Sequence, residues 1–166
     1  MIDKKVLACQ PRNRQTYLNL IAELDVEHNP RYLARDVTGD GKAETFCNIF
    51  LGDCSMRLGA PIPHMLANQQ VEWLSGPAGP ASGWLELLPL PEATVDAQAV
   101  ARAELGLPTV AVWANPTGGH GHVGFIVPAE PPTPGVHIAA AGARNFQNAP
   151  IQRSFGVLKY RVFTHA

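Results

Sequence analysis

Apolar residues recur at helical spacing in three segments of the chain. The spacing of Tyr17, Leu20 and Leu24 predicts a helix over residues 14–26. The same pattern predicts a second helix over residues 46–58, just before Gly59. A third helix is expected within EATVDAQAVARAELGLP, because its apolar positions keep the helical period and a Gly and a Pro close it.

The second half of the chain has the pattern of short strands. TVAVWA, HVGFIV, VHIAAA and FGVLKYRVF are β-branched or aromatic runs, and NPTGGHG, PAEPPTPG and RNFQNAP separate them as expected loops. Residues 75–83, SGPAGPASG, are also expected to form a loop. Helices precede strands, which predicts an α+β fold with an antiparallel sheet. At 166 residues, we expect one domain over residues 1–166.

Composition excludes several classes of protein. The net charge of -1 gives no excess of positive charge for binding nucleic acid. Three cysteines at uneven spacing offer neither a disulfide framework nor a paired metal motif. No apolar run is long enough for a secretory signal or a membrane span. The chain is therefore expected to be made in the cytoplasm, and to act elsewhere only after release or delivery.

The stretch TFCNIFLGDC places Cys47 at the start of the second predicted helix. A helix N-terminus and a nearby histidine lower the pKa of a thiol and make it a nucleophile. His122 opens the strand HVGFIV, where it is placed to act as the base, and His120 competes for that role two residues earlier. Cys54 falls on the apolar side of the same helix and is expected to be buried, while Cys9 has no such surroundings.

TFCNIFLGDC, the downstream PIPH, GHVGFIVP and AGARNFQ resemble, in this order, the bacterial and phage cell-wall hydrolases of the NlpC and CHAP type. These enzymes belong to the papain-like cysteine peptidase superfamily. The resemblance covers the chain from about Asn29 onward. It implies a papain-like fold, no cofactor, and a peptidoglycan endopeptidase or amidase that acts on the stem peptide. If the chain is a delivered effector, an immunity protein is a further expected partner.

The resemblance also implies roles for single residues. Cys47 matches the nucleophile and His122 the base. Tyr32 matches the tyrosine that such enzymes often place upstream of the cysteine, near the oxyanion. Asn48, beside Cys47, is the second expected contact to the oxyanion or substrate.

The third member of the expected triad has two candidates in VHIAAAGARN, His137 and Asn145. NlpC-type enzymes usually have a histidine at this place, and CHAP enzymes a Glu or an Asn. Asn145 is favoured, because AGARNF carries the resemblance and an amide oxygen can hold the imidazole tautomer. The expected site is therefore a Cys-His-Asn triad.

The acidic run before Cys47 follows the first nine positions of an EF-hand loop, with a Gly at the sixth position. Its candidate calcium ligands are Asp36, Thr38, Asp40, Lys42 and Glu44. The twelfth position, where such loops have a bidentate Glu, is Cys47. Two readings stay open, a calcium loop with fewer ligands and a metal-free turn, and the missing carboxylate favours the turn.

Other classes of function are less well supported by the residues. None of the six histidines forms an HExxH motif, which disfavours a zinc enzyme. His64 and the three tryptophans are expected to be structural. The main alternative is a non-catalytic phage or cell-wall-binding module that keeps the fold. Alkylation of Cys47 no faster than that of a free cysteine would favour that alternative.

Overall fold

The structure is a computed structural model that describes residues 11–166, so Cys9 lies outside the described part. These residues form six helices and six strands. The helices are α1 (Arg14–Leu24), α2 (Cys47–Arg57), α3 (Ala67–Ser75), α4 (Ala78–Ala81), α5 (Val95–Glu104) and α6 (Gln152–Phe155). The strands are β1 (Trp84–Glu86), β2 (Thr109–Trp113), β3 (His122–Val127), β4 (His137–Ala140), β5 (Phe146–Pro150) and β6 (Arg161–His165).

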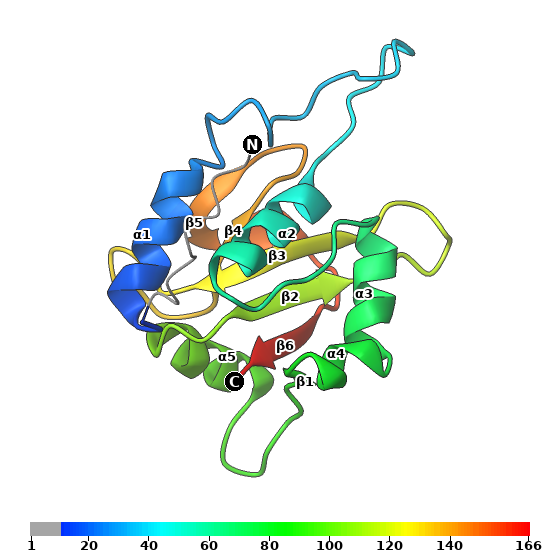
Figure 1. Cartoon of the computed structure of the whole chain (residues 1–166). Coiled ribbons are helices and arrows are strands. Elements are labelled where there is room, and N and C mark those ends of the chain that lie inside the picture. The colour runs from blue at the N-terminus through cyan, green and yellow to red at the C-terminus, as the bar shows by residue number, and fades with distance from the viewer. Residues whose placement is uncertain (1–10) are drawn as a thin grey trace, which may run out of the picture.

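The strands form one sheet in the order β1-β6-β2-β3-β4-β5. Every neighbouring pair is antiparallel, which confirms the predicted α+β class. Helices α1, α2 and α3 lie on the same side of the sheet (Figure 1). Helix α2 packs directly against β3, and one continuous hydrophobic core joins the helices to the sheet. No helix among residues 11–166 combines the length and the apolarity that a membrane span requires.

Helix α1 is tied to the centre of the sheet by Tyr17. The Asn13 side chain caps the helix by accepting the N–H of Thr16, and Asp25 ends it in the left-handed region at φ 46°. Tyr17 is fully buried, and its hydroxyl donates to the carbonyl of Ile126 on β3 over 2.9 Å. The helix predicted over residues 14–26 is thus confirmed, and it ends two residues early.

Three segments differ from the sequence-based expectation. Residues 75–83 contain a single helical turn, α4. Residues 146–150, expected as a loop, form β5, in which Phe146 and Ala149 are buried. The long strand expected from FGVLKYRVF is confined to residues 161–165, because Phe155 ends α6 instead.

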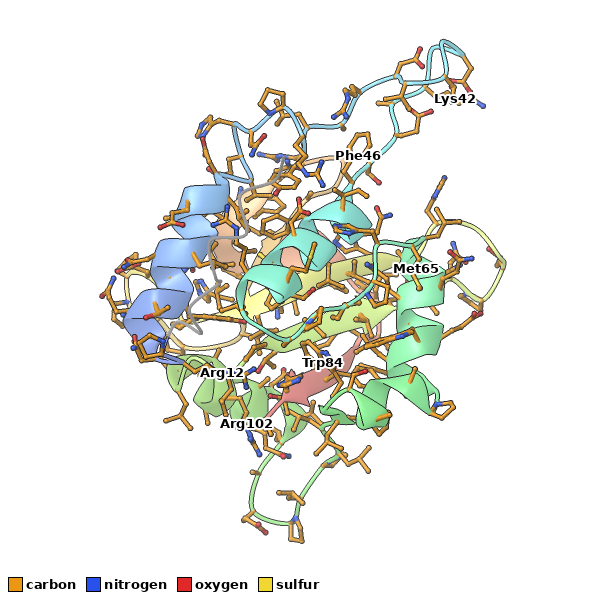
Figure 2. All side chains as sticks on the ribbon, in the orientation of Figure 1. Arg12, Lys42, Phe46, Met65, Trp84 and Arg102 are labelled. Carbon is orange, nitrogen blue, oxygen red and sulfur yellow. The ribbon has the colours of Figure 1, made fainter. Side chains whose placement is uncertain are left out.

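Residues 36–44 form an arm that projects from the body of the protein (Figure 1). A single β-bridge between Arg35 and Glu44 closes its base. Gly39 and Gly41 turn the chain at φ 79° and 81°, values that favour glycine. Lys42 lies at the tip and Phe46 at the base, next to the start of α2 (Figure 2).

Candidate active site

Cys47 is the first residue of α2, as the sequence predicts. The residue before it, Phe46, makes no side-chain capping hydrogen bond, and the first turn has no acidic residue. The N–H groups of this turn therefore keep their partial positive charge on the side of the thiol. Cys47 is only 4% exposed, so its thiol is reached through a narrow opening.

The pKa of the Cys47 thiol is raised, not lowered as the sequence led us to expect. Burial is the largest cause, because it disfavours the charged thiolate. The nearby backbone N–H groups of Val123, Asn48 and Cys47 itself act in the opposite direction and lower the pKa, but they do not outweigh burial. The resting side chain is therefore a neutral thiol surrounded by backbone donors.

His122 is the first residue of β3, and two residues of α6 contact its ring. Its Nε2 lies 2.8 Å from Oγ of Ser154. The ring of Phe155 lies 4.5 Å from the His122 ring, centroid to centroid. Burial lowers the pKa of His122 from 6.5 to about 4. At neutral pH the imidazole is uncharged.

Cys47 and His122 lie on elements that pack against each other, because α2 contacts β3 and His122 is the first residue of β3. The backbone N–H of Val123, the neighbour of His122 in the chain, is among the groups that lower the pKa of the Cys47 thiol. Since Nε2 of His122 faces Ser154, Nδ1 is the ring nitrogen left for the thiol. Among the described residues Nδ1 makes no hydrogen bond.

A groove of about 470 Å³ opens over the start of α2 and has Cys47 in its wall. Its sides come from the base of the arm, the start of α3 and the loop between β2 and β3. Apolar and polar side chains alternate along it; they include Val37, Glu44, Phe46, Asn48, Ile49, Leu66, Asn68 and His120. His122 is not part of this lining and lies deeper, against α6.

His120 and His122 thus differ in their surroundings. His120 is exposed on the groove, and its side chain makes no hydrogen bond among the described residues. His122 is partly buried and hydrogen-bonded. A base has to be held in one orientation, and this favours His122 over His120 for that role.

Asn68 fixes the loop that carries these histidines. Its amide nitrogen donates to the carbonyl of Gly119 over 2.9 Å, and its oxygen accepts the N–H of Asn115 over 2.9 Å. A Cβ at Gly121 would lie 2.3 Å from the Asn68 oxygen, so only glycine fits there. The start of α3 and the loop therefore form one continuous wall of the groove.

Asn48 lines the groove but uses its side chain to hold a neighbouring segment. Its amide nitrogen donates to the carbonyl of Met65 over 2.8 Å. Gln70, which is fully buried, donates from Nε2 to the carbonyls of Asn48 and Pro63, both over 3.0 Å. These bonds brace the first turn of α2. The backbone N–H of Asn48 remains directed at the thiol.

The expectation that Asn145 orients the base is corrected by its contacts. Its amide nitrogen donates to the carbonyls of Val26 and Tyr32, over 2.6 and 3.0 Å. Its oxygen accepts the N–H of Gly142 over 2.9 Å. Both amide hydrogens are thus committed to the backbone, and the hydrogen bond to His122 comes from Ser154 instead. Asn145 ties the turn before β5 to the segment after α1.

His137, the other candidate, lies at the far end of the same strand pair. It pairs with Val127, five positions along β3 from His122. At ~3.3 Å per residue this separation is roughly 16 Å. Its two nitrogens lie 2.8 Å from Oδ1 of Asn148 and 3.0 Å from Oγ1 of Thr133. His137 is a buried structural histidine.

Tyr32 does not reach the expected oxyanion position. Its hydroxyl donates to Oδ2 of Asp53 over 2.8 Å. Asp53 is six residues after Cys47 in α2, about 9 Å along the helix axis. Burial, followed by the hydrogen bond to Asp53, raises the pKa of Tyr32. His64, with Nε2 2.9 Å from the same carboxylate, belongs to this structural cluster.

In the arm, the carboxylates of Asp36, Asp40 and Glu44 lie within 4.8 Å of one another. Backbone N–H groups already occupy them. Asp36 accepts from three N–H groups of the turn, which lower its pKa, and Glu44 accepts the N–H of Val37. Thr38 and Lys42 take part through their own backbone N–H groups. These are the hydrogen bonds by which acidic side chains brace a turn.

Sequence reasoning missed Ser154 and Gln70. Ser154 stands in QRSF, directly before residues that we expected to form a strand, and a lone serine has no motif that marks a contact to histidine. Gln70 lies in a segment with no distinctive chemistry. Only the fold brings either residue to the site. Comparison with protein-family models and with curated proteins finds no match for this chain.

Proposed function

We propose that this protein is a cysteine-dependent amide hydrolase with a papain-like arrangement of nucleophile and base. One observation carries the proposal. The first residue of α2 is a cysteine on the wall of a groove, and α2 packs on β3, whose first residue is a histidine hydrogen-bonded to Ser154. Helix-start cysteine, strand-start histidine and an adjoining groove make up the components of a nucleophilic site.

In the first half of the reaction the thiol attacks a substrate carbonyl. Because both side chains are neutral at rest, the thiol proton passes to Nδ1 of His122 as the sulfur–carbon bond forms. The negative charge on the carbonyl oxygen faces the N–H groups of Cys47 and Asn48 in the first turn of α2. His122 then gives its proton to the leaving nitrogen, the carbon–nitrogen bond breaks, and a thioester remains.

The second half returns the enzyme to its starting state. Water attacks the thioester and passes a proton to His122, and the acid leaves as the carbon–sulfur bond breaks. The sulfur recovers its proton from His122. No charged imidazolium has to exist before substrate binds, which agrees with the pKa of about 4 for His122. At pH 7 only about one imidazole in a thousand would be protonated.

For the substrate we propose the peptidoglycan stem peptide, with the bond cut by an endopeptidase or amidase. This part rests on the resemblance of TFCNIFLGDC and GHVGFIVP to NlpC- and CHAP-type enzymes. The groove supports a peptide in general terms, since a mixture of apolar and amide side chains lines it. Action on the cell wall requires release or delivery of the chain, and an immunity protein would then be a partner.

The test is digestion of purified peptidoglycan, with mass analysis of the released fragments. We expect turnover by the wild type and none by Cys47→Ala or His122→Ala, while circular dichroism shows an intact fold for both. His120→Ala is the matched control and should keep most of the activity. Loss with His120→Ala and not with His122→Ala would assign the base to His120. No turnover by the wild type, together with slow Cys47 alkylation, would favour a non-catalytic cell-wall-binding module.

A further inference from the structure

Ser154 makes the single side-chain hydrogen bond of His122 among residues 11–166, and it takes no part in the proposed bond-making steps. The Oγ–Nε2 distance is 2.8 Å, a good length for such a bond. Ser154 lies in the short helix α6, and its N–H donates to the carbonyl of Ile151. The serine is thus fixed by backbone structure and does not depend on a mobile loop.

The neighbour of Ser154 restricts the same ring from another direction. Phe155 is 2% exposed and lies against His122, and Tyr160 packs on the other part of Phe155 with centroids 5.5 Å apart. Gly142 lies near the Cε1 edge of the His122 ring: a Cβ added to this glycine would be 3.6 Å from Cε1. The ring has little room to turn over. The hydrogen bond to Ser154 therefore keeps Nε2, and not Nδ1, turned toward α6.

No charged group replaces this hydrogen bond. Burial is the sole cause of the lowered His122 pKa. Arg153, on the same helix as Ser154, lies over the Phe146 ring, and the Tyr160 hydroxyl donates to Asp96. Helix α2, which packs on β3, carries Cys47, whose pKa is raised by burial. A hydroxyl is the partner, where many cysteine hydrolases have an amide or a carboxylate.

We propose that Ser154 is the positioning residue of the base: its hydroxyl accepts the Nε2 proton of His122 and so presents an unprotonated Nδ1 to Cys47. The expected effect on the reactivity of Cys47 rests on the proposed function. The expected tautomer of His122 does not depend on it. A hydroxyl can accept the Nε2 proton without adding charge. The histidine therefore remains a neutral base, and the thiol gives up its proton only during attack.

The experiment is nitrogen NMR of the full chain labelled with ¹⁵N-histidine at pH 7, with His122 assigned by the spectrum of His122→Ala. In the wild type we expect the proton on Nε2. In Ser154→Ala we expect a mixture of the two tautomers, and iodoacetamide should label Cys47 roughly five- to tenfold more slowly, as the loss of about 1 kcal/mol of neutral hydrogen bond predicts. Ser154→Thr keeps the hydroxyl and should restore both results.

Ser75→Ala is the matched control, because Ser75 is also a helical serine with a bonded hydroxyl, to Val71, but belongs to α3. It should change neither tautomer nor labelling. An unchanged His122 tautomer and labelling rate in Ser154→Ala would overturn the inference, and so would a failure of Ser154→Thr to restore them. If the wild type cuts no amide, the proposed function fails, while the NMR result still decides on Ser154.

Discussion

At the scale of single residues, Cys47 and Cys54 stand in the same helix, but their surroundings lead us to expect one reactive and one unreactive thiol. Cys47 opens on the groove, whereas Cys54 is completely buried in the core. Burial raises the pKa of both thiols. The two thiols therefore differ in their access to solvent and in their distance from a base, and not in their state of ionisation.

We therefore expect brief iodoacetamide treatment of the folded protein to label Cys47 and to spare Cys54. Because the pKa of Cys47 is raised, the labelling rate should keep increasing from pH 7 toward pH 10. A preformed thiolate would instead give a constant rate over that range. Mass mapping of labelled peptides measures both rates, and unfolding in guanidinium should make the two cysteines equal. Equal labelling in the folded state would contradict the nucleophile assignment.

We expect Asn145 to contribute to stability, because its side chain makes three hydrogen bonds to the backbone. Asn145→Ala leaves the carbonyls of Val26 and Tyr32 without this donor, and we expect a loss of about 1–3 kcal/mol in the free energy of unfolding. Urea unfolding measures it. Asn19→Ala, an exposed position on α1, is the control and should change little. Loss of turnover at unchanged stability would restore Asn145 to the catalytic unit.

At the scale of elements, regular patterns in the sequence were good predictors. HVGFIV predicted β3 to the residue, since its β-branched and aromatic side chains need no help from elsewhere in the chain to favour a strand. FQNAP was missed because Asn, Gln and Pro normally mark loops, and here pairing with β4 overrides that preference. The helix start at Cys47 was predictable, whereas Ser154 and the true contacts of Asn145 were not, because they depend on segments far apart in sequence.

The arm is the element whose chemistry is most open to a simple test. Its carboxylates accept N–H groups from the turn itself, and the twelfth loop position is the buried Cys47. We expect superimposable melting curves in EDTA and in excess Ca²⁺. Asp40→Ala should lower the melting temperature slightly and equally in both solutions. A rise of several degrees with Ca²⁺, abolished in Asp40→Ala, would instead establish a calcium site.

At the scale of the whole molecule, acid should destabilise the fold in two steps. His122 has a pKa of about 4 when folded and 6.5 when unfolded, so the unfolded chain binds more protons between these values. The stability is complete above pH 6.5 and is lost as the pH falls toward 4, by roughly 3 kcal/mol. A second loss of stability follows below pH 3.8, because the pKa of the Asp53 carboxyl is lowered in the folded protein. Burial acts to raise that pKa, but the hydrogen bonds from Arg31 and Tyr32 outweigh it.

Urea unfolding from pH 7 to pH 4 measures the first step. His122→Asn should flatten the curve in this range, because the variant has no imidazole to protonate. His28→Asn is the control: His28 is exposed and paired with Asp25, so the loss should persist. The same slope in wild type and His122→Asn would show that His122 is not held neutral.

The order of strands also bears on how the chain is synthesised. The strand that comes last along the chain, β6, lies between β1 and β2 and is the sole sheet partner of β1. A nascent chain that has passed residue 150 can pair β2 through β5, but one long edge of β2 stays open and β1 has nowhere to pair. An open edge invites pairing with other chains. Translation that stalls before residue 161 would therefore leave a product prone to aggregate, although every residue of the groove had already been made.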